Sequence, residues 1–196
     1  AQEGGQALLI RNATVHTAGP QGTLEGSDVL VQGGTIRAIG KALAAPAGAQ
    51  VVEADGKPLT PALFAGITGI GLEEVSGEPP TVDNAVSLED QPVRPEFDVT
   101  LAYNPASVLV PVARVVGIGF SMLGADSVRG GSIIGGQGGT VRLDGSLDAI
   151  GPRILFVTLG GDGANLSGSS RAAQWMLLDQ LIDEVRRRIP RDSQFA

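Results

Sequence analysis

Short apolar segments separated by turn signals fill the first sixty residues of the chain. Apolar side chains recur at strand-like spacing in five segments, at residues 7–17, 28–32, 35–39, 51–54 and 57–60. The first segment contains a break near Asn12. Gly33-Gly34 and Asp55-Gly56 each lie between two segments, and both dipeptides favour the positive φ angles of tight hairpin turns. The pattern predicts a small domain of short antiparallel strands over residues 1–60.

Helical spacing joins strand spacing from residue 61 onward. Apolar segments at 117–122, 140–143 and 154–159 predict strands, whereas residues 97–103 and 107–115 show helical or mixed periodicity. Apolar residues recur at helical spacing from Arg171 to Arg188, and Pro190 is expected to end that helix. The stretches 130–139 and 160–169 are rich in glycine and are predicted to be loops. Residues 61–196 therefore read as an α/β domain.

The amino-acid composition argues against several classes of function. Of the 196 residues, 42% are hydrophobic, enough for a packed core, and no apolar run is long enough to span a membrane. A net charge of −7 and an aromatic content of 4% disfavour nucleic acids and anionic membranes as partners. The chain has no cysteine, which excludes disulfides and thiol catalysis.

One motif is more specific than these patterns. Residues 59–71 read LTPALFAGITGIG, after the phrases IRNATV at 10–15, DVLVQGGTIRAIG at 28–40 and VVEADGKPLTP at 51–61. In this order the phrases resemble the amidohydrolase superfamily, where a strand close to VTPGLIDAHTHxG opens a barrel. The phrase GGSIIGGQGG at 130–139 resembles the glycine-rich loop of imidazolonepropionase-like members, many of them exported. The resemblance implies a small β-sandwich domain at 1–60 and, at 61–196, the first part of a TIM-type barrel that is incomplete in this chain.

The two metal-binding histidines of that motif are absent. Ile67 and Gly69 stand at the histidine positions, and Ala65 stands at the aspartate position. Residues i and i+2 of a strand project to one face, so two histidines at this spacing can bind one metal ion. Isoleucine and glycine side chains offer no lone pair. This segment is therefore expected to hold no metal, and zinc or another divalent ion is expected only if later strands supply the ligands.

Other candidate residues have simple structural interpretations. Thr68, Glu73 and Glu74 are possible barrel-mouth residues, although a solvated loop is the favoured interpretation of the two glutamates. His16, the only histidine, is expected to be a surface or packed residue of a strand. Ser169 or Ser170 is expected to cap the helix that follows, and no catalytic residue is assigned.

The resemblance implies a class of reaction and leaves three functions open. Amidohydrolases of this kind cleave non-peptide C–N bonds of the cyclic amide or imine type by means of a metal-activated hydroxide. The protein is a hydrolase with a metal held by later strands, or a non-catalytic pseudo-enzyme that serves as structural or regulatory partner of an active paralogue, or a protein that binds a small ligand without turnover. The substrate is not encoded in this segment.

Partners and location follow from the same resemblance. An open half-barrel would expose strand edges, so the remainder of the barrel is the expected partner, on the same or a second polypeptide. A homo- or hetero-oligomer is also expected. The start Ala1-Gln2-Glu3 is typical of a chain cut by signal peptidase, which suggests a periplasmic or exported protein, the alternative being a trimmed cytoplasmic one.

Overall fold

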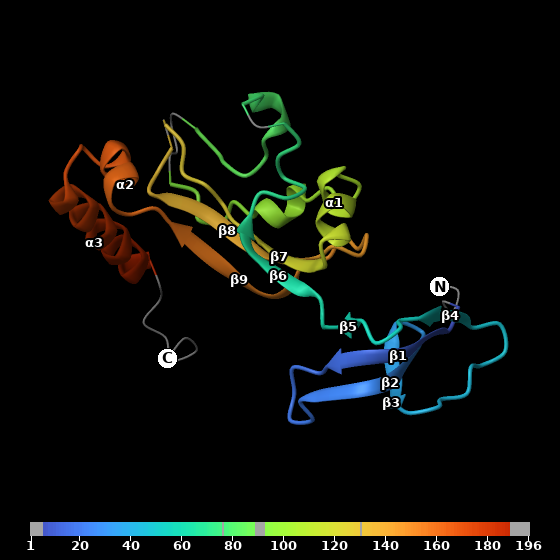
Figure 1. Cartoon of the computed structure of the whole chain (residues 1–196). Helices are drawn as coiled ribbons and strands as arrows, with labels where there is room; N and C mark the ends of the chain where they lie inside the picture. Colours follow the sequence, from blue (N-terminus) through green and yellow to red (C-terminus); the bar gives the residue numbers. More distant parts are fainter. Residues whose placement is uncertain (1–5, 76, 89–92, 130, 189–196) are drawn as a thin grey trace. The chain divides into compact units, whose positions relative to one another are not determined.

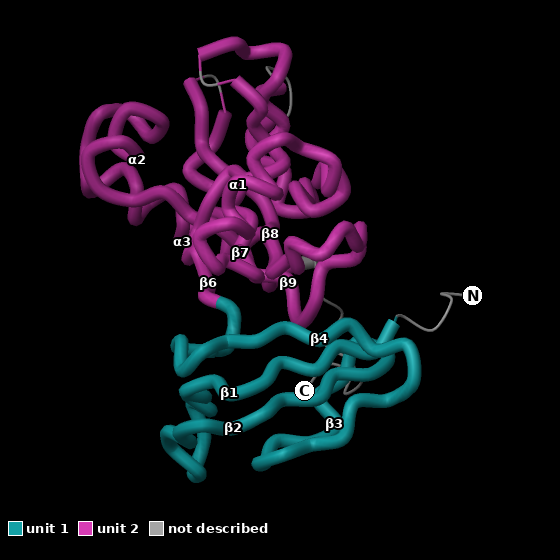
Figure 2. The backbone as a smooth tube through the Cα atoms, turned by 45° about the vertical axis from the view of Figure 1, so that its right-hand side comes forward, with its two compact units in different colours: residues 1–62 teal, residues 63–196 magenta. Residues whose placement is uncertain are grey.

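The chain divides into two compact units, Ala1–Ala62 and Leu63–Ala196. The computed structural model describes residues 6–75, 77–88, 93–129 and 131–188. The elements of each unit are labelled in Figure 1, and the two units are coloured teal and magenta in Figure 2. Pro190, expected to end the last helix, lies outside the described residues.

Unit 1 is a single sheet of five strands. They are β1 (Leu8–His16), β2 (Thr23–Gln32), β3 (Thr35–Gly40), β4 (Gln50–Glu53) and β5 (Pro58–Leu59), in the order β3-β2-β1-β4 with β5 also paired to β1. The predicted hairpin at Gly33-Gly34 is confirmed, because Gln32 pairs with Thr35 and both glycines have positive φ. Ala13, Val15 and Val29 form the core of this unit. The two-layered sandwich predicted for residues 1–60 stays a prediction.

The predicted hairpin at Asp55-Gly56 is wrong. Both flanking strands, β4 and β5, pair with β1, and both run parallel to it. The reason lies in β1, whose register shifts between Ile10 and Ala13 at the predicted break near Asn12, a residue with a φ of 51°. The Asp55-Gly56 turn follows that bulge, since the Gly56 amide donates to the Asn12 carbonyl at 2.7 Å.

Asp28 holds the bulge from the other side. Its carboxylate accepts hydrogen bonds from the backbone amides of Asn12 and Leu43, both at 2.9 Å. These bonds, that from Asn12 first, lower the pKa of Asp28 because they stabilise the ionised form.

Unit 2 is built on a mixed sheet of four strands in the order β6-β7-β8-β9. They are β6 (Leu63–Thr68), β7 (Ile118–Leu123), β8 (Ile134–Arg142) and β9 (Ile150–Val157). The helical elements are η1 (Pro79–Thr81), η2 (Val99–Ala102), α1 (Leu109–Val115), α2 (Gly161–Leu166) and α3 (Arg171–Arg188). The α/β character, the strand predicted at 117–122 and the helix predicted from Arg171 to Arg188 are confirmed.

One face of this sheet is covered and holds the core. Val99 of η2, Val110 of α1 and the nearby Tyr103 pack with Leu123 and Val141 of the sheet. Figure 1 shows α1 beside the β6–β7 end of the sheet, and α2 and α3 after β9. We call this the covered face.

The glycine-rich stretch is not the loop that the sequence predicted. Gly135, Gly136, Gly138 and Gly139 all lie within β8, in the middle of the sheet. A side chain at Gly136 would meet the Phe97 ring, 2.9 Å from its Cδ1 atom, and one at Gly138 would meet the Phe156 ring. The glycines therefore let neighbouring segments pack directly on the strand backbone. The polar stretch 160–169, also predicted as a loop, contains α2.

Candidate functional site

Three strands of unit 2 end at the same edge of the sheet. β6 and β7 are parallel, and β8 is antiparallel to both β7 and β9, so β9 runs in the same direction as β6 and β7. Ligand sites of α/β proteins gather where such strands end at their carboxyl side. The residues that follow the three strands here are Gly69, Gly124 and Thr158. This edge is the candidate functional site.

The first predicted ligand position is apolar. Ile67 lies in β6 directly after Gly66, which has a φ of 82°, and the pairing with β7 shifts register there. A Cβ at Gly124 would lie 2.7 Å from Ile67 Cγ2 and 3.3 Å from Phe156 Cε1. Ile67 and Phe156 therefore converge over Gly124, which has no side chain to separate them. Position 67 thus contributes hydrocarbon to the sheet face.

The second ligand position lies just beyond β6 in a tight turn. The carbonyl of Gly69 accepts hydrogen bonds from the amides of Leu72 at 2.8 Å and Glu73 at 2.9 Å. A Cβ at Gly69 would lie 3.5 Å from Glu73 Oε2 and 3.9 Å from Asn84 Nδ2. The buried Asn84 amide in turn donates to Asp126 at 2.9 Å. The surroundings of position 69 are therefore polar, unlike those of position 67.

The other predicted mouth residues have partners within the fold. Thr68 Oγ1 lies 2.6 Å from the buried Ser121 Oγ, on the covered side of β6. Glu74 accepts hydrogen bonds from Asn104 Nδ2 at 3.1 Å and Ser107 Oγ at 2.9 Å, so it joins the loop after β6 to the segment before α1. Glu73 is half-buried beside Gly69. A functional role for any of the three stays a prediction.

The residues of this edge do not fit a metal ion. The side chains of Ile67 and Gly69 provide no ligand atom, and no group of three or more His, Cys, Asp and Glu side chains in the described ranges could hold a metal ion. His16 lies in unit 1, where its Nδ1 atom is 3.0 Å from Thr23 Oγ1. No reaction step is therefore assigned to a metal held by these residues.

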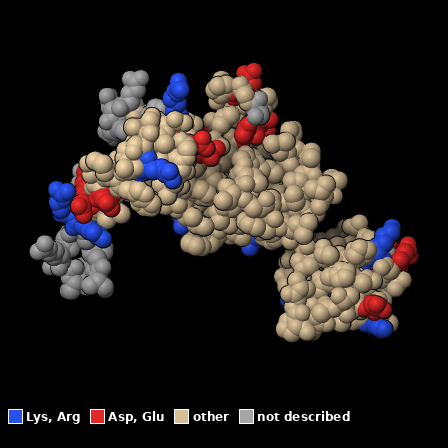
Figure 3. Space-filling model, turned by 60° about the vertical axis from the view of Figure 1, so that its left-hand side comes forward, with Lys and Arg blue, Asp and Glu red and all other residues tan. Residues whose placement is uncertain are grey.

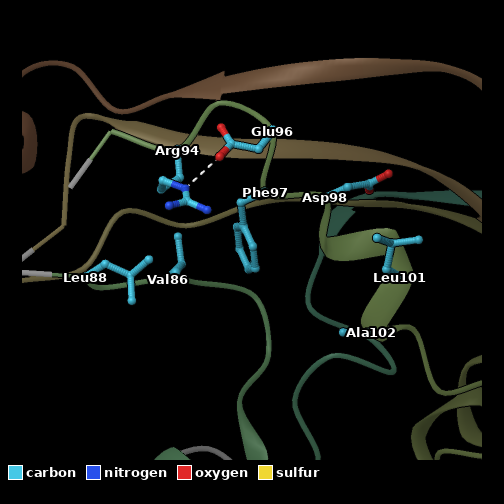
Figure 4. A pocket seen from close by; sticks show the side chains of 8 residues that line it. All are labelled: Val86, Leu88, Arg94, Glu96, Phe97, Asp98, Leu101 and Ala102. Carbon is cyan, nitrogen blue, oxygen red and sulfur yellow. Dashed lines mark ion pairs between the residues drawn. The ribbon is translucent and has the colours of Figure 1, made fainter. Parts of the chain in front are cut away.

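A separate cavity of about 420 Å³ lies beside η2 (Figure 4). Its wall is largely apolar, and its charged groups are already paired: Arg94 with Glu96 at 2.6 Å, and Asp98 with Arg153 at 2.7 Å. It is lined by Val86, Leu88, Arg94, Glu96, Phe97, Asp98, Leu101 and Ala102. Sequence analysis missed it, because Val86, Leu88, Arg94 and Glu96 lie outside the helices and strands and no local pattern shows that they meet η2.

Asp98 fixes the segment that forms this cavity. Its carboxylate caps η2 through the Thr100 amide at 3.0 Å and also accepts the Thr100 hydroxyl at 2.7 Å. Partial burial acts to raise the pKa of Asp98, but the hydrogen bonds from Arg153 and Thr100 outweigh it and leave the pKa below its ordinary value. Asp98 is therefore an ionised structural anchor.

Comparison with known proteins gives a structural likeness only. No protein-family model matches the chain, and no curated protein sequence matches it significantly. The solved structure of an amidohydrolase from Thermotoga maritima MSB8 matches 92% of this chain with a TM-score of 0.75 and 24% sequence identity. A triazine hydrolase from Arthobacter aurescens matches 58% of this chain and 27% of its own at 22% identity, with a TM-score of 0.38.

The first of these matches defines the fold. Nearly the whole described chain follows the Thermotoga amidohydrolase, whereas this chain spans 48% of that protein's length. The chain thus has the fold of about half of an amidohydrolase. Among the described helices, none combines the length and apolar character needed to cross a bilayer.

Proposed function

We propose that this chain forms the N-terminal half of an amidohydrolase-type protein whose first strand supplies an apolar wall in place of metal ligands. The likeness to the Thermotoga amidohydrolase and the LTPALFAGITGIG segment support the fold assignment. The proposed loss of the metal ligands is supported by the structure at positions 67 and 69. Ile67 packs towards Phe156, and Gly69 forms a turn.

The class of reaction is hydrolysis of non-peptide C–N bonds of the cyclic amide or imine type. In that class a metal-activated hydroxide attacks the carbonyl or imine carbon. Here the ligands of such a metal would have to come from residues outside the first strand. The described residues shape the site: the apolar side chains of Ile67 and Phe156 form one wall, and the turn at Gly69 places the Glu73 carboxylate beside it.

A second candidate is a non-catalytic role, as structural or regulatory partner of an active paralogue or as a small-ligand binding protein. The absence of a metal-binding side chain at positions 67 and 69 favours the non-catalytic role. So does the engagement of Glu74, whose two carboxylate oxygens bond to Asn104 and Ser107. Export, suggested by the Ala1-Gln2-Glu3 start and the imidazolonepropionase-like resemblance, and the oligomer expected of an open half-barrel belong to the proposal in either form.

One experiment separates the two candidates. The complete polypeptide is purified, its metal content is measured, and it is assayed against a panel of cyclic amides and imines. Bound metal with turnover of at least one substrate supports the hydrolase. Absence of both, in a folded protein, supports the non-catalytic role and overturns the hydrolase.

A paired substitution probes the first strand directly. Ile67→His with Gly69→His restores the ligand spacing, and the turn at Gly69 leaves room for a Cβ, because its nearest neighbours lie at ordinary contact distance. If the remaining ligands are present, zinc affinity rises by at least about tenfold over the parent, measured by titration calorimetry. The control is Thr68→His, which points to the covered side. Equal zinc affinity in all three proteins would count against a site completed by later strands.

A further inference from the structure

One polar side chain of α3 is buried although its apolar neighbours are exposed. Gln174 is 4% exposed, whereas Trp175 and Met176 are each 62% exposed. Burial of a polar amide costs free energy unless its donor and its acceptor are both paired. Specific partners, rather than the exclusion of apolar surface from water, therefore determine where Gln174 lies.

Both ends of the Gln174 side-chain amide bond to one residue, Gly160. The Gly160 amide donates to Gln174 Oε1 at 3.0 Å, and Gln174 Nε2 donates to the Gly160 carbonyl at 2.7 Å. The side chain thus pairs with the backbone of Gly160 as a residue of a neighbouring strand would. Two bonds to the same residue fix both the place and the orientation of the backbone there.

The backbone of Gly160 needs such support. This residue precedes α2 with a φ of 87° and a ψ of −144°, close to a conformation that is essentially confined to glycine. Glycine is also the residue with the greatest freedom to leave such a conformation. The Gly160 carbonyl accepts a further hydrogen bond from the Ala164 amide at 2.9 Å, in the first turn of α2. Gln174 therefore fixes the point at which α2 begins.

Gly163 of α2 allows close packing at the same point. It is buried, and a Cβ there would overlap the Thr158 carbonyl oxygen and lie 3.5 Å from Gln174 Cδ. Thr158 is held in turn by the sheet, since its amide donates to the Ile133 carbonyl at 2.8 Å. The end of β9, the start of α2 and the Gln174 side chain thus pack directly on one another.

This packing lies at the candidate functional site. Thr158 follows β9 as Gly69 follows β6 and Gly124 follows β7, and Figure 1 shows α2 and α3 after the end of β9. A displacement of about 1 Å in a residue that holds a ligand can weaken a site severely, even when its cause is remote. A side chain that fixes the backbone two residues beyond Thr158 can therefore act on the site without touching it.

Charged side chains contribute less to the attachment of α3. Asp179, Asp183 and Arg186 are exposed, and Arg186 pairs with Asp183 on the same helix. Figure 3 shows that a broad area of the larger body carries few Lys, Arg, Asp or Glu side chains in that view. Because exposed ion pairs are screened by water, the buried bonds of Gln174 are the stronger polar tie between α3 and the end of β9.

We propose that Gln174 is a positioning residue of the candidate site. It ties α3 to Gly160 and so holds residues 158–160 in one place at the carboxyl edge of the sheet. The proposal rests on the proposed function only in placing the site at this edge, and it applies to the hydrolase and to the non-catalytic role alike.

The first experiment measures the position of this segment in the complete polypeptide. Leu159→Cys and Val75→Cys, both at exposed positions, carry spin labels after β9 and after β6, and any cysteine outside these 196 residues is replaced by serine. Gln174→Met removes both hydrogen bonds, and Gln180→Met, at an exposed glutamine of the same helix, is the matched control. We expect the distribution of label distances to broaden at least about twofold in Gln174→Met and to stay unchanged in the control. Equal widths would overturn the proposal.

A conservative variant covers the case in which Gln174→Met does not fold. In Gln174→Glu the protonated carboxyl still donates to the Gly160 carbonyl, whereas the carboxylate has no donor and faces that carbonyl. The distribution should match the parent at about pH 4 and broaden reversibly towards about pH 9. Gln180→Glu carries the same change of charge and should show no such dependence. A width independent of pH in Gln174→Glu would overturn the proposal.

Turnover separates this proposal from the proposed function. In a polypeptide that hydrolyses a cyclic amide or imine, Gln174→Met should raise KM at least about threefold, while Gln180→Met keeps the parent value. An unchanged KM would overturn the role of Gln174 at the site. In a polypeptide without turnover the hydrolase fails, and the label distances alone decide whether Gln174 positions the segment.

Discussion

The two faces of the four-stranded sheet differ although they belong to the same strands. The covered face presents Ser121, Leu123 and Val141 to η2 and α1 and is sealed from water. The opposite face, called the open face, presents Ile67, which is 69% exposed, and Ile154, which is 45% exposed. The side chains on both faces are largely apolar, so the difference does not come from polarity. It shows that a sheet with two apolar faces needs two partners, and the described chain supplies one.

The motif at residues 59–71 relates the difference between the two faces to the candidate functional site. Positions 67 and 69, which the resemblance aligns with the first two metal ligands of amidohydrolases, lie in β6 and just beyond its end. Residue 68, between them, faces the covered side, where Thr68 bonds to Ser121. The same strand thus supports the core with one residue and shapes the candidate site with its neighbours.

The largest expected effect comes from Gly138, where the backbone of the neighbouring strand and an aromatic ring leave no room for a side chain. A Cβ at Gly138 would overlap the carbonyl oxygen of Leu123 and lie 2.8 Å from Phe156 Cε2. Gly138→Ala must therefore displace backbone, and we expect it to lower the free energy of unfolding by about 3 kcal/mol, measured by urea denaturation.

The control for this substitution is another glycine of unit 2. Gly161 opens α2 and has no atom within 4 Å of an added Cβ. Gly161→Ala should change the free energy of unfolding by no more than about 0.5 kcal/mol. Equal effects at the two glycines would show that β8 does not need the close approach described for it.

Local signals in the sequence were sufficient for several elements. Gly33-Gly34 predicts its hairpin because the turn demands two residues of positive φ, and the helix from Arg171 to Arg188 is visible in its apolar spacing. The break near Asn12 is likewise encoded locally. The likeness of this chain to an amidohydrolase structure agrees with the motif at residues 59–71.

Contacts between distant residues were not predictable from local signals. Residues 135–139 look like a loop because glycine dominates them, yet they form the centre of β8 since Phe97, Leu123 and Phe156 leave no room for side chains. Asp55-Gly56 looks like a hairpin turn and instead follows the bulge of β1. The pairing of Asp98 with Arg153 joins residues 55 positions apart.

A smaller effect is expected at the anchor of the covered face. Arg153→Met removes the 2.7 Å ion pair with Asp98, whose side chain is 17% exposed, and leaves its carboxylate with Thr100 alone. Because Arg153 is 34% exposed, solvent screens part of the interaction, and we expect a loss of about 1 kcal/mol in urea denaturation.

A more exposed ion pair serves as the comparison. Arg186 lies 3.8 Å from Asp183 on α3, and the two side chains are 75% and 59% exposed. Arg186→Met should therefore leave the free energy of unfolding unchanged within about 0.3 kcal/mol. A loss of unfolding free energy as large as that of Arg153→Met would mean that the Asp98–Arg153 pair contributes no more to stability than an exposed ion pair.

The smallest effect is a dependence of stability on pH. The pKa of Asp98 is lower in the folded protein than its ordinary value of 3.8, so the folded state binds this proton less tightly than the unfolded state. The stabilisation is complete above pH 3.8 and is lost as the pH falls through the lowered pKa. Denaturation at pH 3 and at pH 6 should show a smaller difference in Asp98→Asn than in the parent. An unchanged difference would show that Asp98 does not contribute to the pH dependence of stability.

The proposed half-barrel architecture requires that the open face of the unit 2 sheet be covered in the complete polypeptide. The most direct test is the unfolding free energy of the complete polypeptide with Ile67→Asn, compared with Arg114→Asn on exposed α1. If the open face is covered, Ile67→Asn buries an amide without partners and loses apolar contact, and stability should fall by about 3 kcal/mol. The Arg114 variant should stay within about 0.5 kcal/mol of the parent. Equal stability of the two variants would contradict the account.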